Sequence, residues 1–267
     1  MASKQLKTVL VTGASGGIGY ELARLFARDK YNLVLVARHT TKLEQVAQEF
    51  KAQHGVAVTV LTKDLVQPAA PEEIFGELQQ AGIQIDILVN NAGFATYGPF
   101  AEASLQDELD MLQVNMVALT HLTKLFLPAM LAQHRGKILN VASTAAFQPG
   151  PLMAVYYATK AYVLSFSEAI ANELAGSGVT VTALCPGATR TGFQERAAMQ
   201  ESKLVQGVIM DAKTVAQLGY RGLMRNQPVV IPGARNKFLT FIVRFTPRQM
   251  VTQIVRHMQE SNGSQNP

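Results

Sequence analysis

Near its start the chain reads Thr8-Val9-Leu10-Val11-Thr12-Gly13-Ala14-Ser15-Gly16-Gly17-Ile18-Gly19. The apolar run is typical of a buried strand, and helix-forming residues follow the glycines directly. A strand, a glycine-rich turn and a helix in this order are typical of the phosphate-binding turn of a dinucleotide-binding fold. We expect Gly13 to permit the tight turn, Gly17 to let the backbone approach a pyrophosphate, and Gly19 to let the helix pack closely on the strand. A structural turn that binds no ligand is the alternative.

Short apolar runs alternate with amphipathic stretches through most of the chain. The runs predict seven strands, at residues 8–11, 32–37, 57–62, 85–90, 137–141, 180–185 and 229–231. The stretches predict helices at residues 17–29, 41–53, 71–81, 105–131, 155–177 and 211–225. This alternation predicts an α/β, single-domain Rossmann fold, with a doubly wound, seven-stranded parallel sheet and helices on both faces.

Helix starts and connections add detail to this fold. Thr41 stands three residues before Glu44 and Ser104 three before Asp107, a spacing that predicts a side-chain cap at each helix start. Residues 190–210 form a long segment after the sixth strand, so we expect a lid there, over the carboxyl edge of the sheet. We find no linker between two domains. We expect residues 1–233 to form the dinucleotide-binding and catalytic part, and residues 234–267 a basic, apolar C-terminal helical extension.

The composition is that of an ordinary globular protein, with 267 residues of which 48% are hydrophobic and 16% charged. The single cysteine, Cys185, excludes an intramolecular disulfide framework and a multi-cysteine zinc site. The five histidines show no paired metal spacing, so we expect no metal. We find no signal peptide and no transmembrane segment, and a cytoplasmic location is the expectation.

Positive charge is concentrated at the C-terminal end. The net charge is +5, and residues 211–267 carry 8 Lys and Arg against 2 Asp and Glu. This distribution argues against a nucleic-acid-binding protein with one large basic face. Residues 235–258 combine cations with many aliphatic and aromatic side chains, and Pro247 divides them into two short pieces. Such a segment can make a peripheral contact with an anionic membrane surface, cover a substrate pocket, or pack against the protein itself or a partner subunit.

At the end of the second predicted strand, where an NAD-binding fold usually carries an acidic residue, the sequence reads Val36-Ala37-Arg38-His39. A guanidinium at Arg38 suits a 2′-phosphate, which an aspartate would repel. Ser15 could add a hydroxyl contact. The sequence therefore predicts a preference for NADP(H), with NAD(H) as a possible second cofactor. A solvated charge at the helix entry is the alternative reading of Arg38.

Four further motifs follow in order along the chain. Asn90-Asn91-Ala92-Gly93 follows the fourth strand, Ser143 the fifth and Pro186-Gly187 the sixth, while Tyr156-Tyr157-Ala158-Thr159-Lys160 starts a helix. Together with the glycine turn they resemble the short-chain dehydrogenase/reductase family, over about residues 5 to 233. The resemblance implies an oxidoreductase that acts on a CH–OH group, and a homodimer or homotetramer.

The residue types themselves fit carbonyl reduction. Transfer of a nicotinamide hydride to a ketone creates an alkoxide, which needs a proton donor and a polarising hydrogen bond. We expect Tyr156 to be the general acid/base and Ser143 the polarising group. A phenol with a pKa of ~10 needs a group that stabilises its phenolate, and Lys160 stands four residues later on the same helix. Tyr157 lacks this spacing, so we expect it to point into packing.

The resemblance also implies roles for individual residues. Ser143 would hydrogen-bond the substrate carbonyl, and Asn115 would hold a water that links Lys160 to solvent. A buried structural amide is an equally good interpretation of Asn115. The residues expected at the cofactor are Gly13, Ser15, Gly17, Ile18, Gly19, Arg38, Asp64, Leu65, Asn91, Ala92, Gly93, Tyr156, Lys160, Pro186, Gly187, Thr189 and Thr191. Cys185 is expected to be a small buried side chain without a nucleophilic role.

The predicted substrate-side loops are rich in apolar residues, with Arg190 as their one obvious arginine. The apolar residues are Phe94, Tyr97, Phe100, Phe147, Leu152, Met153 and Phe193. They predict an apolar or acyl-type carbonyl or alcohol as the small-molecule substrate. Two other functions stay open on the sequence. One is an epimerase or dehydratase of the same family, and the other is a non-catalytic NADP(H)-binding or membrane-associated interaction protein that works through its basic tail.

Overall fold

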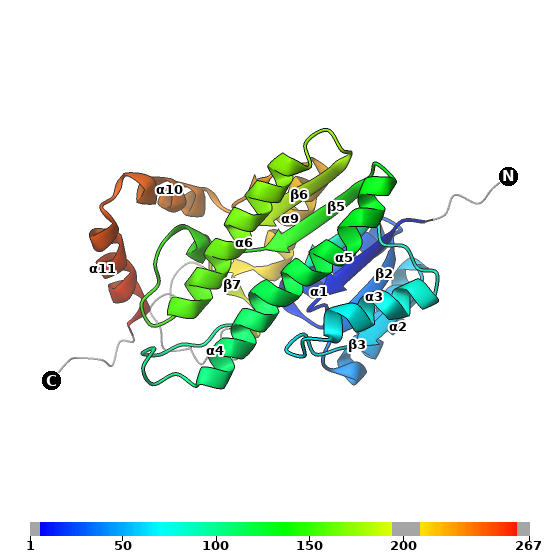
Figure 1. The fold of residues 1–267 in the computed structure, drawn as a ribbon, viewed down its shortest axis with the longest axis horizontal. Coiled ribbons are helices and arrows are strands. Elements are labelled where there is room, and N and C mark those ends of the chain that lie inside the picture. The colour runs from blue at the N-terminus through cyan, green and yellow to red at the C-terminus, as the bar shows by residue number, and fades with distance from the viewer. Residues whose placement is uncertain (1–5, 194–208, 261–267) are drawn as a thin grey trace.

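Seven parallel strands form the main sheet of the computed structural model, which describes residues 6–193 and 209–260. They lie in the order β3-β2-β1-β4-β5-β6-β9. Their bounds are β1 (Thr8–Thr12), β2 (Asn32–Ala37), β3 (Val58–Thr62), β4 (Ile87–Asn90), β5 (Gly136–Val141), β6 (Val179–Leu184) and β9 (Val229–Val230). The predicted α/β fold with a seven-stranded parallel sheet is confirmed (Figure 1).

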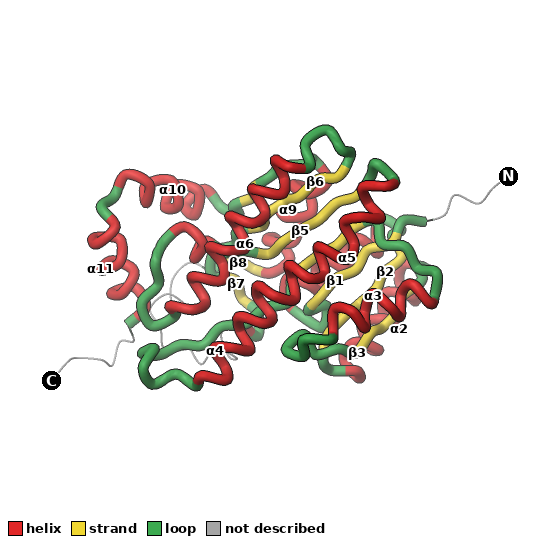
Figure 2. Tube along the Cα trace, in the orientation of Figure 1, coloured by secondary structure: helices red, strands yellow, loops and turns green. Residues whose placement is uncertain are grey.

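Helices cover both faces of this sheet. Their bounds are α1 (Gly17–Arg28), α2 (Thr40–His54), α3 (Ala70–Gln80), α4 (Leu105–Leu112), α5 (Leu119–Ala132), α6 (Ala154–Glu173) and α9 (Ala212–Met224). Helices α1, α2 and α9 pack on one face through a buried cluster that includes Phe26, Phe50 and Leu223. Helices α3 and α5 pack on the other face through a cluster that includes Ile74 and Phe126. Figure 2 shows α5 and α6 lying across the near face of the sheet.

The predicted helix ends agree with the structure to within a few residues, and one of the two predicted caps is wrong. Ser104 caps α4 as predicted, since its hydroxyl accepts a hydrogen bond from the Asp107 amide at 3.4 Å. The cap at Thr41 is wrong because α2 already begins at Thr40. The Thr40 hydroxyl accepts a hydrogen bond from the Thr62 hydroxyl at 3.0 Å, and Thr41 lies inside the first turn.

The predicted helix at residues 105–131 contains a π-helical turn, Gln113–Ala118, between α4 and α5. This 28-residue run, Leu105–Ala132, has the length and hydropathy of a membrane-spanning helix. Met111, Leu122 and Met130 on it are buried in the core of the protein, which accounts for much of its apolar character. Single π turns of this kind often occur at functional sites in helices.

A second, two-stranded parallel sheet pairs β7 (Thr189–Arg190) with β8 (Met210–Asp211). It joins the two ends of the segment in which a lid is predicted. Most of that lid, residues 194–208, lies outside the described residues. The sheet itself was not predicted, because two residues per strand are too few to form a periodic pattern.

Residues 234–259 are largely helical and lie at one end of the molecule (Figure 1). It consists of α10 (Ala234–Ile242), a 3₁₀ turn (Val243–Phe245) and α11 (Arg248–Gln259). Pro247 separates the two helices as predicted. Val251 and Val255 of α11 are buried in the same apolar cluster as the start of α6. The helical extension is therefore anchored near the start of α6, while its boundary at residue 233 stays a prediction.

Phe26 gives a direct test of the packing between α1 and α9. Its fully buried ring makes edge contacts with Tyr31 and Tyr220, at centroid distances of 5.4 and 4.9 Å. Phe26→Ala should lower the free energy of unfolding by about 3–5 kcal/mol, and Phe26→Leu by much less. Urea denaturation of both variants checks this. A loss below about 1 kcal/mol for the alanine variant would contradict the packing described here.

Candidate functional site

A cavity of about 930 Å³ opens at the carboxyl edge of the sheet, and motifs far apart in the sequence meet on its wall. The predicted site residues that line it are Gly13, Ser15, Gly17, Ile18, Arg38, Asp64, Leu65, Asn91, Ala92, Gly93, Ser143, Tyr156, Lys160, Pro186, Gly187, Thr189 and Thr191. Parallel strands bring these residues together because their carboxyl ends share one edge. Two predicted residues, Gly19 and Asn115, lie behind the wall instead.

The glycine turn has the backbone conformation that its sequence requires. Gly13 and Gly17 have φ values of +64° and +56°, a region that residues with a side chain rarely adopt. A methyl group on Gly19 would collide with the Gly13 carbonyl and the Asn91 side chain, so its role is the close packing of helix on strand. The Asn91 amide donates to the carbonyls of Thr12 and Gly13, at 2.9 and 3.2 Å. The loop after β4 thereby fixes the turn after β1.

Cations line the cavity beside the end of β2. Arg38 and Lys42 are both on its wall, and the Lys42 ammonium lies close to the backbone at Gly16. His39 lines the cavity beside them. Sequence analysis missed Lys42, although its position four residues after Arg38 is a usable signal. Lys63 also lines this side of the cavity, but it is paired with Glu73 and Glu77 at 2.7 Å each. Arg38 and Lys42 have no ion pair in the described part of the chain.

Asp64 and Leu65 follow β3 on the same side of the cavity. The Asp64 carboxylate accepts a hydrogen bond from the Val66 amide at 3.1 Å, which fixes the turn. Leu65 is buried and adds an apolar surface next to this carboxylate. A polar and an apolar side chain side by side suit a flat heterocycle with hydrogen-bonding edges.

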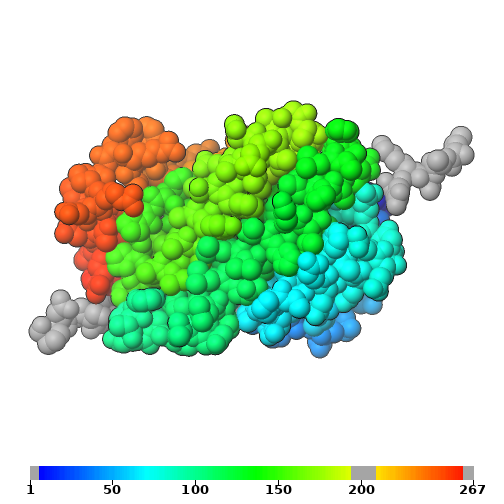
Figure 3. All heavy atoms as spheres, viewed as in Figure 1, coloured from blue at the N-terminus to red at the C-terminus, as the bar shows by residue number. Residues whose placement is uncertain are grey.

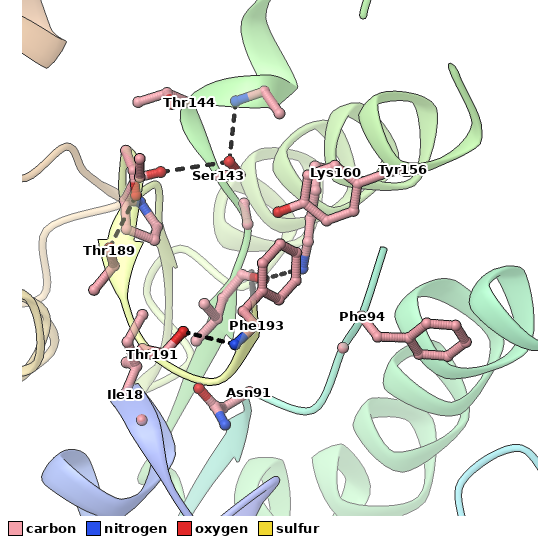
Figure 4. Close-up of a pocket in the computed structure, with 18 of the residues that line it drawn as sticks. Ile18, Asn91, Phe94, Ser143, Thr144, Tyr156, Lys160, Thr189, Thr191 and Phe193 are labelled. Carbon is pink, nitrogen blue, oxygen red and sulfur yellow. Dashed lines mark hydrogen bonds between the residues drawn. The ribbon is translucent and has the colours of Figure 1, made fainter. Parts of the chain in front are cut away.

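Ser143, Tyr156 and Lys160 form a cluster on the opposite side of the cavity. Figure 4 shows the Tyr156 hydroxyl pointing toward Ser143, with Lys160 on the same helix. The Ser143 hydroxyl accepts from the Ala145 amide at 3.1 Å and donates to the Pro186 carbonyl at 3.4 Å. The Lys160 ammonium donates to the Val141 carbonyl at 2.9 Å and lies 5.8 Å from the centre of the Tyr156 ring.

Burial dominates the electrostatics of this cluster. Tyr156 and Lys160 are 9% and 5% exposed. Desolvation raises the pKa of Tyr156 to about 12, while its hydrogen bond with Ser143 lowers it. Desolvation lowers the pKa of Lys160 to about 8. The phenol is therefore held in its protonated form. The sequence predicts that Lys160 lowers the pKa of Tyr156, but burial and the hydrogen bond with Ser143 determine this pKa here.

Asn115 lies in the π turn and braces two parts of the site. Its side chain accepts from the Phe94 amide at 3.1 Å and donates to the Phe94 carbonyl at 3.0 Å. It also donates to the Thr159 hydroxyl at 3.1 Å, which in turn donates to the Tyr156 carbonyl at 2.7 Å. The side-chain oxygen and nitrogen of Asn115 are thus both bonded to the protein, which agrees with its interpretation as a buried structural amide. A water-holding role for Asn115 stays a prediction.

The neighbours of the cluster behave as the sequence suggests. Tyr157 is buried and packs against Gly150 as expected, but it also lines the cavity, which the sequence did not predict. Cys185 is fully buried, and desolvation raises the pKa of its thiol to about 12. A thiol with so high a pKa is a poor nucleophile at neutral pH.

The turn after β6 closes the cavity between the cluster and the glycine turn. The Thr189 hydroxyl donates to the Gly187 carbonyl at 2.9 Å, and the Thr191 hydroxyl accepts from the Phe193 amide at 3.2 Å. The methyl group of Thr191 faces Gly17, so this turn reaches across to the first one. Arg190 is exposed and does not line the cavity.

The rest of the wall is apolar and is built partly by the C-terminal extension. Of the predicted apolar residues, Phe94, Met153 and Phe193 line the cavity. The expectation is wrong for Tyr97, Phe100, Phe147 and Leu152, which lie elsewhere. The extension supplies the missing surface through Leu239, Ile242, Val243, Val251, Ile254, Val255 and Met258. Of the roles that the sequence left open for this segment, covering the pocket is thus observed.

This arrangement defines a Rossmann-fold protein with a serine, tyrosine and lysine at the end of its cofactor-type cavity. The family model of short chain dehydrogenases matches residues 7–202. A short-chain dehydrogenase of Sphingobium yanoikuyae, solved in complex with NADPH, is 34% identical with a TM-score of 0.81, over 96% of this chain and 99% of that one. The chain belongs to the short-chain dehydrogenase family, which confirms the resemblance seen in the sequence.

Two relatives with assigned activities are also similar. The ketoacyl reductase HetN of Nostoc sp. is 32% identical over 242 residues, 90% of this chain and 79% of that protein. The very-long-chain 3-oxoacyl-CoA reductase of Phaeosphaeria nodorum is 35% identical over 176 residues, 64% of this chain. The match spans only about half of that second relative, 52% of its length.

The buried ammonium of Lys160 should cost the folded protein stability. Its pKa of about 8 lies below the usual ~10.4, so the folded state binds fewer protons between these values. The cost is present below about pH 8 and disappears as the pH rises toward ~10.4. Lys160→Met should therefore raise the free energy of unfolding by roughly 1–3 kcal/mol near pH 7, after the loss of the bond to Val141.

Urea denaturation at about pH 7 and about pH 10 measures this effect. The gain should shrink at the higher pH. Lys160→Arg is the matched control, because it keeps a buried cation and should give no gain. A methionine variant that is less stable than the wild type near pH 7 would contradict the assignment.

Proposed function

We propose that this chain is an NADP(H)-dependent oxidoreductase that interconverts a carbonyl and a secondary alcohol. The observation that carries the proposal is the cluster of Ser143, Tyr156 and Lys160 on the wall of the cavity that the glycine turn opens. A protein that only binds a dinucleotide needs neither the phenol nor the serine. Relatives named as ketoacyl and oxoacyl-CoA reductases support the same class of reaction.

The glycine turn and the cations fit NADP(H). Gly13 and Gly17 have positive φ angles and line the cavity at the start of α1, where the backbone amides of a helix N-terminus suit a pyrophosphate. Arg38 and Lys42 supply two cations for a 2′-phosphate, with Ser15 nearby on the wall. A relative solved with NADPH supports this preference, and NAD(H) is the second possible cofactor.

The remaining lining residues can be assigned to successive parts of the cofactor. Asp64 and Leu65 would border the adenine, and Asn91, Ala92 and Gly93 the adenosine ribose. Pro186, Gly187, Thr189 and Thr191 would hold the nicotinamide end. The chemistry that NADP(H) supplies when bound is hydride transfer to or from the reacting carbon.

Three side chains manage the proton and the charge in this reaction. Ser143 donates a hydrogen bond to the substrate carbonyl oxygen and polarises it. Tyr156 donates its hydroxyl proton to that oxygen as the alkoxide develops, and the reverse transfer serves alcohol oxidation. Lys160 stabilises the resulting phenolate with its ammonium and is the route by which the proton is replaced.

The wall of the cavity favours an apolar or acyl-type substrate. Phe94, Met153 and Phe193 supply apolar surface from the sheet side, and the C-terminal extension supplies the rest. Arg190 is exposed and does not line the cavity, so we assign it no contact with a substrate carboxylate. Assembly into a homodimer or homotetramer and a cytoplasmic location stay predictions.

Removal of the Tyr156 hydroxyl tests the general acid. Tyr156→Phe should lower kcat by about a hundredfold to ten-thousandfold and leave the Kd for NADPH unchanged. Tyr162→Phe is the matched control, since it removes a tyrosine hydroxyl of the same helix that bonds Thr120 and does not line the cavity, and it should keep most of the activity. Steady-state kinetics with an apolar ketone gives kcat, and NADPH fluorescence gives Kd. A Tyr156→Phe variant with wild-type kcat would overturn the assignment.

Removal of the Arg38 guanidinium tests the cofactor preference. Arg38→Ala should lower the ratio of kcat/KM for NADPH to that for NADH by about 10- to 100-fold, because a charge-assisted hydrogen bond is lost. Lys63→Ala removes a cation on the same wall that is already paired with two glutamates, so it should leave the ratio nearly unchanged. An unchanged ratio in the Arg38 variant would contradict its assigned role.

A further inference from the structure

The outer side of the C-terminal extension carries an exposed aromatic surface. Phe238, Phe241 and Phe245 are 62%, 56% and 71% exposed, and Met250 is 52% exposed. The rings of Phe241 and Phe245 contact each other edge to face, at a centroid distance of 5.1 Å. Clustered exposed phenylalanines are uncommon on a monomer surface unless they bind something. We call these four residues, together with the cations described next, the tail face.

Four exposed cations belong to the tail face: Arg235, Lys237, Arg244 and Arg248. None of them has an ion pair in the part of the chain that the structure describes. Between Ala234 and Gln259 the sequence has five Lys and Arg and no Asp or Glu. The tail face therefore combines apolar rings with uncompensated positive charge.

The tail face borders the rim of the cavity. Leu239, Ile242, Ile254 and Met258 are 41%, 41%, 52% and 38% exposed, and all four also line the cavity. These four apolar side chains are thus exposed on the extension and line the cavity at the same time, beside the polar lining residues Arg235, Asn236, Thr240 and Thr246. Figure 3 shows that the extension forms one end of the molecule.

We propose that the tail face docks on an anionic membrane surface, with the rim of the cavity facing the lipid. Short helices with apolar residues on one side and Lys or Arg around them lie in the headgroup layer of such membranes. The cations pair with lipid headgroups, and the phenylalanines enter the acyl boundary. Resting on the proposed function, the cavity then receives an apolar carbonyl compound dissolved in the bilayer.

Charge argues against a second copy of the chain as the occupant. In a twofold-symmetric dimer the tail face would meet itself, so that its four cations would be brought together without acidic partners. An anionic bilayer offers the complementary charge instead.

Co-sedimentation with lipid vesicles tests the docking independently of any reaction. The full chain is mixed with vesicles of phosphatidylcholine alone, or of phosphatidylcholine with about one-third phosphatidylserine. We expect binding at least about tenfold tighter to the anionic vesicles, and loss of this difference between about 0.1 M and about 1 M salt. Equal binding to both kinds of vesicle, or no binding, overturns the proposal.

Two double variants test the cations and the phenylalanines of the tail face separately. Arg244→Glu/Arg248→Glu should weaken anionic binding by about tenfold or more, whereas Lys124→Glu/Arg225→Glu, the same charge change outside the extension, should weaken it far less. Phe241→Ser/Phe245→Ser should weaken binding as well, whereas Leu105→Ser, at an exposed residue of α4, should not. All substituted residues are exposed, and NADPH binding checks that each variant is folded.

Light scattering without lipid distinguishes a dimer. If Phe241→Ser/Phe245→Ser turns an oligomer into a monomer and the wild-type protein does not bind vesicles, the tail face is a subunit interface and the proposal is wrong. Reduction of a long-chain ketone delivered in vesicles should fall in the tail variants but persist for the same ketone in detergent. If no variant and no wild-type protein reduces any ketone in either form, the proposed function fails while the vesicle-binding result still stands.

Discussion

All seven strands of the main sheet run parallel, so every strand ends at the same edge, and the whole site depends on this constraint. The turn after β1 and the loop after β4 meet there because the two strands are neighbours. The Asn91 amide then bonds the carbonyls of Thr12 and Gly13, so that one side chain sets both the glycine turn and the loop. Without the shared edge, residues 13, 91 and 156 would have no common cavity to line.

Burial gives the cluster its chemical character. Tyr156 is kept protonated by desolvation, which suits a donor of protons to an alkoxide. The same desolvation brings the pKa of Lys160 to about 8, close to neutral pH, where a proton is easily exchanged. A buried cation lowers the stability of the folded state, and this is the kind of cost that functional sites carry. Asn115 forms hydrogen bonds with Phe94 and Thr159, and these bonds hold the backbone around Tyr156 in place.

The sequence predicted the strands, the glycine turn and the positions of Ser143, Tyr156 and Lys160, because each has a local pattern. It did not predict the π turn at Asn115, since apolar residues follow it on most sides of the helix and hide a one-residue shift in their spacing. Thr41 was expected to cap a helix because its spacing to Glu44 is right. The helix begins one residue earlier, at Thr40, whose hydroxyl accepts a hydrogen bond from Thr62 at the end of β3. The extension was left with three roles because apolar spacing is the same for a pocket wall, an interface and a membrane helix. Tertiary contacts decide such cases.

The central claim is that the cavity at the carboxyl edge is an NADP(H) site. Isothermal titration calorimetry of the wild-type protein with NADPH and with NADH tests it most directly. The account predicts one NADPH per chain, with a Kd at least about tenfold lower than that for NADH, because Arg38 and Lys42 meet a phosphate that NADH lacks. The absence of binding by both nucleotides, or tighter binding of NADH, would contradict it.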